Sequence, residues 1–177
     1  MPDKMDAVAL LKADHRKVED LFEKFEKAKS DSVKKTLVQQ ICTELSVHTA
    51  IEEEIFYPAC TGEIEDDLLK EGYVEHDGAK VMMAELMQSE PGDDFYDAKV
   101  KVLSEEIKHH VKEEERRAEG MFAQARDAGL DMDALGEQMA ARKAELLAQF
   151  KAGGLPAPET RSFSGHKLVQ AQPVAAV

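Results

Sequence analysis

Two histidine-containing units of nearly equal length constrain the fold of this chain more than any other feature. His15 stands 33 residues before the sequence HTAIE of residues 48–52, and His76 stands 34 residues before HVKEE of residues 110–114. Residues four apart in a helix lie one above the other, so each His-x-x-x-Glu pair presents both side chains on one helix face. The repeat therefore predicts a helix-pair unit that is used twice, as in a bundle with pseudo-twofold symmetry.

These polar residues interrupt apolar stripes with helical spacing. The stripe of the first helix consists of Val8, Leu11, His15, Val18, Phe22 and Phe25. A second helix is predicted over 33–57, with Pro58 and Gly62 as its end. A third is predicted over 64–89 and ends at the sequence EPGDD of residues 90–94.

The C-terminal half of the sequence predicts two more helices. A long fourth helix runs from the EPGDD break to Gly129, and its stripe consists of Val100, Leu103, Ile107, His110, Glu114 and Met121. A fifth helix over 132–151 is closed by Gly153-Gly154. Three of the six prolines follow in a segment with little periodicity, which predicts an irregular tail.

Four amphipathic helices joined by short breaks predict an all-α, up-down-up-down four-helix bundle. We expect residues 1–130 to form this bundle and 131–152 to form the additional helix. Residues 153–177 would form a Pro-containing extended tail. The fifth helix could cap the bundle or make a dimer contact, so both a monomer and a homodimer stay open.

Composition narrows the range of partners and compartments. The net charge of −13 would repel a nucleic-acid backbone or an anionic membrane, and no apolar run reaches the ~18 residues of a membrane span. The N-terminus has no recognisable signal peptide, so we expect a cytoplasmic protein. Cys42 and Cys60 are 18 residues apart on one predicted helix, roughly 27 Å, which is too far for a disulfide.

One depth of the predicted bundle is polar, and it holds six residues. They are His15, His48, Glu52, His76, His110 and Glu114. A buried carboxylate is costly unless it is paired or bound to metal, and a single metal-binding layer explains all six positions together. The alternative, unrelated polar residues at helix borders, would explain any one histidine but not the doubled pattern.

The neighbouring polar residues are expected at the surface. His109 clusters with charged residues on the outer face of the fourth helix, and His166 lies in the tail, so both are predicted to be solvated. Glu53, Glu54, Glu113 and Glu115 are also assigned to solvated faces, although one or two could accept hydrogen bonds from ligand histidines.

The donor set favours iron, then manganese, then zinc, because it contains four imidazoles, two carboxylates and no thiolate. Two carboxylates shared between two ions argue for a binuclear centre. With HTAIE, HVKEE and the sequence EEEIFYP of residues 52–58, the chain resembles the hemerythrin-like, HHE cation-binding domain family over about residues 6–127. The resemblance implies two irons joined by an oxo or hydroxo group. Glu52 and Glu114 would bridge them, and His15, His48, His76 and His110 would be terminal ligands.

The sequence departs from the oxygen-carrying hemerythrins at Lys80, where those proteins have a further histidine. With about six ligands per iron, the remaining donors leave roughly two open positions. Lys80 could donate a hydrogen bond or a proton to bound peroxide, or it could extend to the bundle rim. Tyr73, one turn before His76, could be a core residue or could line the site.

These features predict a non-haem di-iron protein that binds or reacts with dioxygen, peroxide or nitric oxide, in oxidative or nitrosative stress or in iron homeostasis. The alternative is a non-catalytic module that senses or stores iron or oxygen and acts through a protein partner. A third interpretation is a structural bundle with zinc or no metal. The residues leave open whether the protein is an enzyme that breaks down peroxide.

Overall fold

A computed structural model describes residues 5–163, and within this range every regular element is helical. The elements are α1 (Ala7–Lys27), α2 (Asp31–Ile51), the π-helical turn η1 (Glu52–Phe56), α3 (Tyr57–Cys60), α4 (Asp66–Met87), α5 (Tyr96–Glu115), α6 (Met121–Asp127) and α7 (Met132–Gly153). The predicted tail residue His166 lies outside the described residues.

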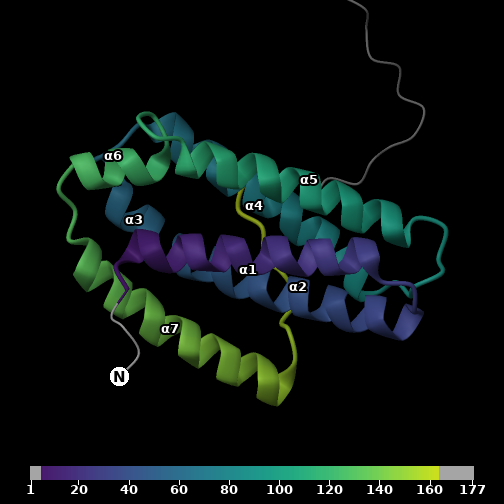
Figure 1. The fold of residues 1–177 in the computed structure, drawn as a ribbon. Helices are drawn as coiled ribbons and strands as arrows, with labels where there is room; N and C mark the ends of the chain where they lie inside the picture. The colour runs from purple at the N-terminus through teal and green to yellow at the C-terminus, as the bar shows by residue number, and fades with distance from the viewer. Residues whose placement is uncertain (1–4, 164–177) are drawn as a thin grey trace, which may run out of the picture.

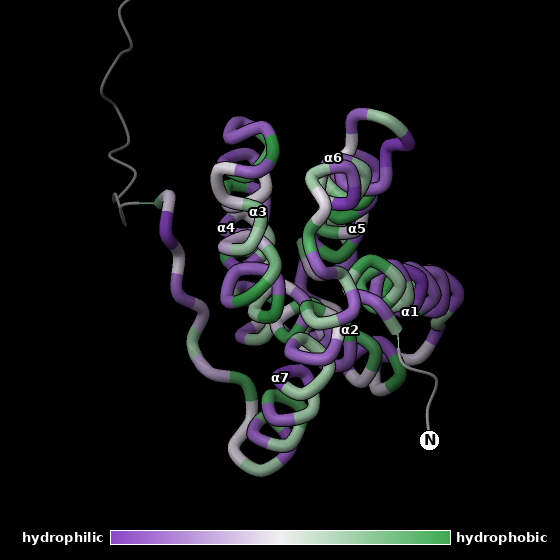
Figure 2. The backbone as a smooth tube through the Cα atoms, turned by 90° about the vertical axis from the view of Figure 1, so that its left-hand side faces the viewer, coloured by the Kyte–Doolittle hydropathy of each residue, from purple (hydrophilic) through white to green (hydrophobic). Residues whose placement is uncertain are grey.

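The helices α1, α2, α4 and α5 run in alternating directions and form a four-helix bundle, as predicted (Figure 1). The helix α7 packs on α1 and α2 outside the bundle, and the segment after it passes along the outside of α4 (Figure 2). No helix among residues 5–163 is long and apolar enough to cross a membrane.

The apolar interior is divided into two clusters along the bundle axis. One contains Val18, Phe22, Leu45, Met83 and Leu103, and the other contains Leu11, Val47, Ile51, Phe56 and Leu69. In α1, His15 stands between Leu11 of one cluster and Val18 of the other. The predicted polar layer therefore lies between two apolar clusters rather than at an end of the bundle.

The second predicted helix continues beyond its expected end. Its chain widens into the π turn of Glu52–Phe56 and then passes through Pro58 to Cys60. Proline lacks an N–H and crowds the preceding helical turn. The wider turn directly before Pro58 relieves this crowding, so the prediction that Pro58 ends the helix was wrong.

The long fourth helix was also mispredicted, because it is two helices. The helix α5 ends at Glu115, where Arg116 is extended with ψ 130°, and the chain becomes helical again at Met121. A Cβ atom on Gly120 would lie 2.5 Å from the carbonyl oxygen of Arg116, so this tight corner requires glycine. The corner lets α6 fold over the bundle end and places the Phe122 ring in stacked contact with His15.

Gly136 lets α7 approach the start of α1 closely. A Cβ atom at this position would lie 2.8 Å from the backbone nitrogen of Ala7 and would also collide with the carbonyl oxygen of Met5. By contrast, a Cβ atom on Gly78 in α4 would meet no atom within 4 Å. The two helical glycines therefore form a matched pair for testing the docking of α7.

We expect Gly136→Ala to lower the free energy of unfolding by roughly 1–3 kcal/mol, because backbone atoms must move to admit the methyl group. Gly78→Ala should instead raise it by about 0.5–1 kcal/mol, since alanine favours the helical conformation. Urea unfolding at equal metal content measures both. A stabilised Gly136→Ala variant would contradict the observed packing of α7.

Candidate metal centre

The four histidines of the predicted layer come together in two pairs. The Nε2 atoms of His15 and His48 are 3.2 Å apart, and those of His76 and His110 are also 3.2 Å apart. Each histidine comes from a different helix of the bundle, and none exposes more than 4% of its surface. The helical stripes thus bring the ring nitrogens of all four into one enclosed layer.

Two carboxylates connect the histidine pairs. Glu52 Oε2 lies 3.2 Å from Nε2 of both His48 and His76. Glu114 places Oε2 3.3 Å from Nε2 of His15, and Oε1 3.5 Å from Nε2 of His110. Each carboxylate therefore contacts one histidine of each pair, which is the arrangement needed to bridge two cations.

Hydrogen bonds within the cluster leave several of the donor atoms without a partner, and a pair of metal ions would supply one. Both oxygens of Glu52 and Oε2 of Glu114 are buried without a hydrogen-bond partner among the described residues. Such atoms are costly unless a cation takes the place of the missing donors. Two groups could each hold an ion and share Glu52: His15, His48, Glu52 and Glu114, and Glu52, His76 and His110.

An outer set of carboxylates contacts the second ring nitrogen of three of the four histidines. Nδ1 lies 2.7 Å from Glu115 in His15, 3.0 Å from Glu53 in His76, and 2.6 Å from Glu75 in His110. A carboxylate in this position holds the proton on Nδ1 and leaves the Nε2 lone pair free for a metal.

His48 has a more distant outer partner. Its Nδ1 is 3.7 Å from Asp14 Oδ2, beyond hydrogen-bond distance, and Asp14 is also paired with Lys143 of α7. The helix α7, outside the four-helix bundle, therefore contributes a cation to the surroundings of this histidine.

These outer acids repeat with the same doubling as the six inner residues. Asp14 and Glu75 directly precede His15 and His76, whereas Glu53 and Glu115 directly follow Glu52 and Glu114. Glu53 and Glu115 take the alternative role that the sequence left open, as hydrogen-bond partners of ligand histidines, rather than lying on solvated faces. Asp14 and Glu75 were missed. An acid directly beside His15, Glu52, His76 and Glu114, at matching positions of the two halves, was the signal that could have found all four.

Of the other two predicted surface residues, Glu54 is exposed and Glu113 is half-buried. Glu54 pairs with Arg142 at 2.6 Å, and Glu113 pairs with Arg116 at 2.6 Å. His109 is 65% exposed, as expected, and its Nε2 lies 3.4 Å from Glu75 Oε1.

Tyr57 reaches the cluster although its sequence position did not suggest it. Its hydroxyl donates a hydrogen bond of 3.0 Å to Glu114 and lies 3.3 Å from Nε2 of His76, on whose ring the phenol stacks. The π turn makes this possible, because the Tyr57 N–H bonds to the Glu52 carbonyl five residues back. In a regular α-helix, Phe56 would follow Glu52 on this face.

Tyr73 and Lys80 lie one contact further from the cluster. The Tyr73 ring packs edge-on against Tyr57 with centroids 5.1 Å apart, so it supports the phenol from outside. The Lys80 ammonium donates a 2.7 Å hydrogen bond to Glu53 Oε1, the atom that also contacts Nδ1 of His76. Lys80 is 11% exposed and reaches the histidine layer through Glu53.

The electrostatics of the layer reflect two acids buried side by side. Burial and the neighbouring Glu114 raise the pKa of Glu52 well above its ordinary value, whereas burial is outweighed at Glu114 by the nearby His110 and His15, which lower its pKa. Burial alone would lower the pKa of His15, but its contacts with Glu114 and Glu115 raise it to about 9. Without a metal, the cluster therefore retains protons that a bound cation would displace.

Comparisons with known proteins identify the family of this chain and a solved structure with a similar fold. A family model of the hemerythrin HHE cation binding domain matches residues 6–122. The fold is similar to the crystal structure of a hemerythrin HHE cation binding domain-containing protein from Mycobacterium kansasii, with a TM-score of 0.71 and 23% sequence identity. The match covers 85% of this chain and 95% of that chain. No curated protein matches the sequence.

The raised pKa of Glu52 predicts a pH-dependent cost in the metal-free protein. Its carboxyl holds a proton more tightly when folded than when unfolded, where its pKa is near 4.5. Its contribution to stability is therefore present below about pH 4.5 and is lost as the pH rises towards the folded pKa. We expect metal-free Glu52→Gln to be more stable than wild type at neutral pH, with a difference that shrinks towards pH 4.

Urea unfolding in the presence of a chelator, over a series of pH values, measures this difference. The exposed neighbour Glu54→Gln is the control, and its stability should not gain in the same pH-dependent way. A Glu52→Gln variant that is no more stable than wild type at neutral pH would show that the buried pair carries no such cost.

Proposed function

The chain belongs to the hemerythrin HHE cation binding domain family, and from this premise we propose that it is a non-haem di-iron protein that binds or reacts with dioxygen, peroxide or nitric oxide. The observation that supports two ions is that Glu52 and Glu114 each contact a histidine of both pairs. A bound iron pair would supply electrons and open coordination positions for a small ligand. Manganese or zinc fits the same donors less well.

In this proposal the six inner residues are the metal ligands. His15 and His48 would hold one ion, His76 and His110 would hold the other, and Glu52 and Glu114 would be shared between the two. We further propose that the bundle of residues 1–130 carries the centre and that the helix of 131–152 supports it. The tail of 153–177 continues from that helix.

The surrounding side chains orient the ligands and handle protons. The Tyr57 hydroxyl donates a hydrogen bond to Glu114 and lies 3.3 Å from Nε2 of His76, so it is an O–H donor on that side of the centre. Lys80 keeps Glu53 in place behind His76. Burial alone would raise the pKa of Glu53, but the contacts with His76 and Lys80 lower it, so Glu53 stays ionised and holds the His76 ring.

Reaction with peroxide or nitric oxide suits a role in oxidative or nitrosative stress or in iron homeostasis. The second candidate is a sensing or storage module without turnover. It is favoured by the contact of Arg161, in the segment after α7, with Glu53 Oε2 at 3.4 Å, which connects that segment to a histidine of the centre. Sustained peroxide consumption supports the enzyme, and stoichiometric binding without turnover supports the sensor.

Metal content and the optical spectrum of the purified protein test the proposed centre. We expect two irons per chain with the charge-transfer bands of an oxo-bridged pair. Glu114→Gln should lose at least one iron and these bands, because one bridging carboxylate is removed. Glu113→Gln, which alters the adjacent half-buried acid, should retain both. One zinc, or no metal after anaerobic iron loading, would exclude the di-iron proposal.

The role of Lys80 can be tested with variants of the iron-loaded protein. We expect Lys80→Met to retain two irons but to react with peroxide about 10- to 100-fold more slowly, the usual cost of losing an outer partner of a ligand. Lys70→Met, at an exposed lysine of the same helix, is the control. If both variants react with peroxide and oxygen like wild type, Lys80 has no role in that reaction.

A further inference from the structure

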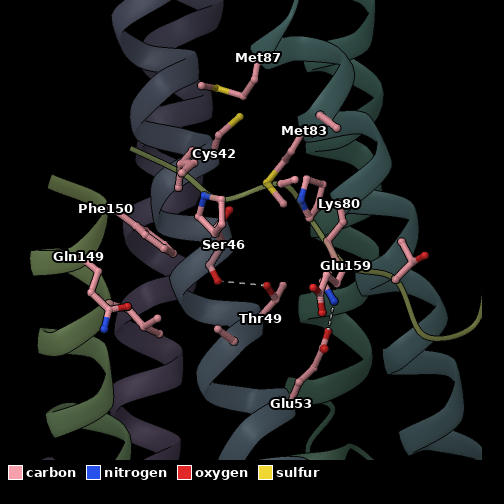
Figure 3. Close-up of a pocket in the computed structure, with 18 of the residues that line it drawn as sticks. Cys42, Ser46, Thr49, Glu53, Lys80, Met83, Met87, Gln149, Phe150 and Glu159 are labelled. Carbon is pink, nitrogen blue, oxygen red and sulfur yellow. Dashed lines mark hydrogen bonds and ion pairs between the residues drawn. The ribbon is translucent and has the colours of Figure 1, made fainter. Parts of the chain in front are cut away.

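A second potential binding site lies outside the metal centre. A solvent-open cavity of about 700 Å³ lies between α2, α4, α7 and the extended segment 155–161 (Figure 3). Its volume is in the range of sites that bind small organic molecules. The cavity is separate from the layer of ring Nε2 atoms, but one of its walls contains Glu53 and Lys80.

The wall formed by the extended segment follows from its sequence and is fixed by specific contacts. Gly154 has φ 78° and turns the chain away from α7, and Pro156 and Pro158 keep the segment from becoming helical. Asp77 of α4 anchors its far end. The carboxylate oxygen Oδ2 accepts hydrogen bonds from the backbone N–H of Arg161 at 2.8 Å, and from the N–H and hydroxyl of Ser162 at 2.6 Å each.

The lining changes from apolar to charged along the cavity. Met83, Met87, Leu146, Phe150 and Leu155 provide apolar surface from three sides. Methionine adapts its shape to irregular ligands. Figure 3 shows Glu53, Lys80 and Glu159 together, away from Met87 and Cys42. Arg161 lines the same cavity and contacts Glu53.

The charged end holds two acids, Glu53 and Glu159, and two bases, Lys80 and Arg161, and the bases have N–H donors to spare for an anion. Glu53 is already engaged by Nδ1 of His76, by Lys80 and by Arg161. An ammonium has three N–H donors and a guanidinium has five, so Lys80 and Arg161 can each take a further acceptor. The Arg161 side chain is also 58% exposed and can turn towards a ligand.

We propose that this cavity binds an amphipathic organic acid, with the apolar body against Met83, Met87 and Phe150 and the carboxylate on Lys80 and Arg161. This site goes beyond the proposed metal function and does not depend on which metal is bound. An occupant would share Lys80 and Arg161 with Glu53, and would thus lie one side chain away from His76.

The proposal can be tested by isothermal titration calorimetry of the purified full chain with decanoate, decanol and decylamine. Each compound is used below the concentration at which it self-associates. We expect one saturable site for decanoate and at least about tenfold weaker binding of decanol, which cannot form charge-assisted hydrogen bonds. Decylamine should bind no better than decanol. Absence of saturable decanoate binding, or equal binding of decanoate and decylamine, would overturn the proposal.

Two variants separate the apolar and charged ends. Ala84→Phe adds a ring into the cavity that Ala84 lines and should abolish binding of both decanoate and decanol. Arg161→Gln should weaken decanoate about tenfold and leave decanol unchanged. Arg117→Gln, at an exposed position remote from the cavity lining, is the control and should bind like wild type.

Circular dichroism, thermal unfolding and metal content establish that each variant is folded and loaded. If Ala84→Phe does not fold, the selective loss of acid binding in Arg161→Gln decides the question by itself. Unchanged decanoate affinity in Arg161→Gln would overturn the assignment of the charged end. A wild-type protein that holds no iron after loading but still binds decanoate would count against the proposed metal function. The result would still support the organic-acid site.

Discussion

The burial of Glu52 and Glu114 side by side is the constraint on which the rest of the bundle depends. Removing a carboxylate from water costs several kcal/mol unless opposite charge and hydrogen-bond donors replace the solvent. Apolar clusters above and below the layer exclude the solvent, and the four imidazoles provide only part of what the acids require. A layer of this kind is stable as part of a metal centre, but without a metal it lowers the stability of the folded protein.

The outer acids connect the two halves of the repeat. Asp14 and Glu75 lie near the second histidine of their own helix pair, whereas Glu53 and Glu115 hydrogen-bond to the first histidine of the other pair. Each half therefore orients ligands of the other, and neither half forms a complete site alone. Lys143 of α7 adds to this shell by its pairing with Asp14.

The sequence predicts the inner residues well because they obey the 3.6-residue period that also forms the core. It does not identify the partners of Glu53 or Glu75, because these lie on other helices and depend on how the helices pack. The sequence does not identify Tyr57 for another reason. In a regular α-helix, a residue five positions after Glu52 lies about 140° around the helix axis from it. The break after Glu115 was hidden because Met121 happens to continue the apolar stripe of α5.

The π turn makes chain length, and not only residue identity, a determinant of this site. Between Glu52 and Tyr57 the helix contains one residue more than a regular α-helical turn needs, so the turn amounts to a single-residue insertion within a continuous helix. Removing any one of Glu53, Glu54, Ile55 or Phe56 would restore ordinary helical geometry and still keep the phenol above the bridging acid. Because the acid and the phenol keep their places, the same deletion would leave the part of α2 before the turn aligned with Pro58 and the residues after it. Two chains with identical ligands can thus differ by one residue in length between the acid and the phenol and still align the two ends of this helix.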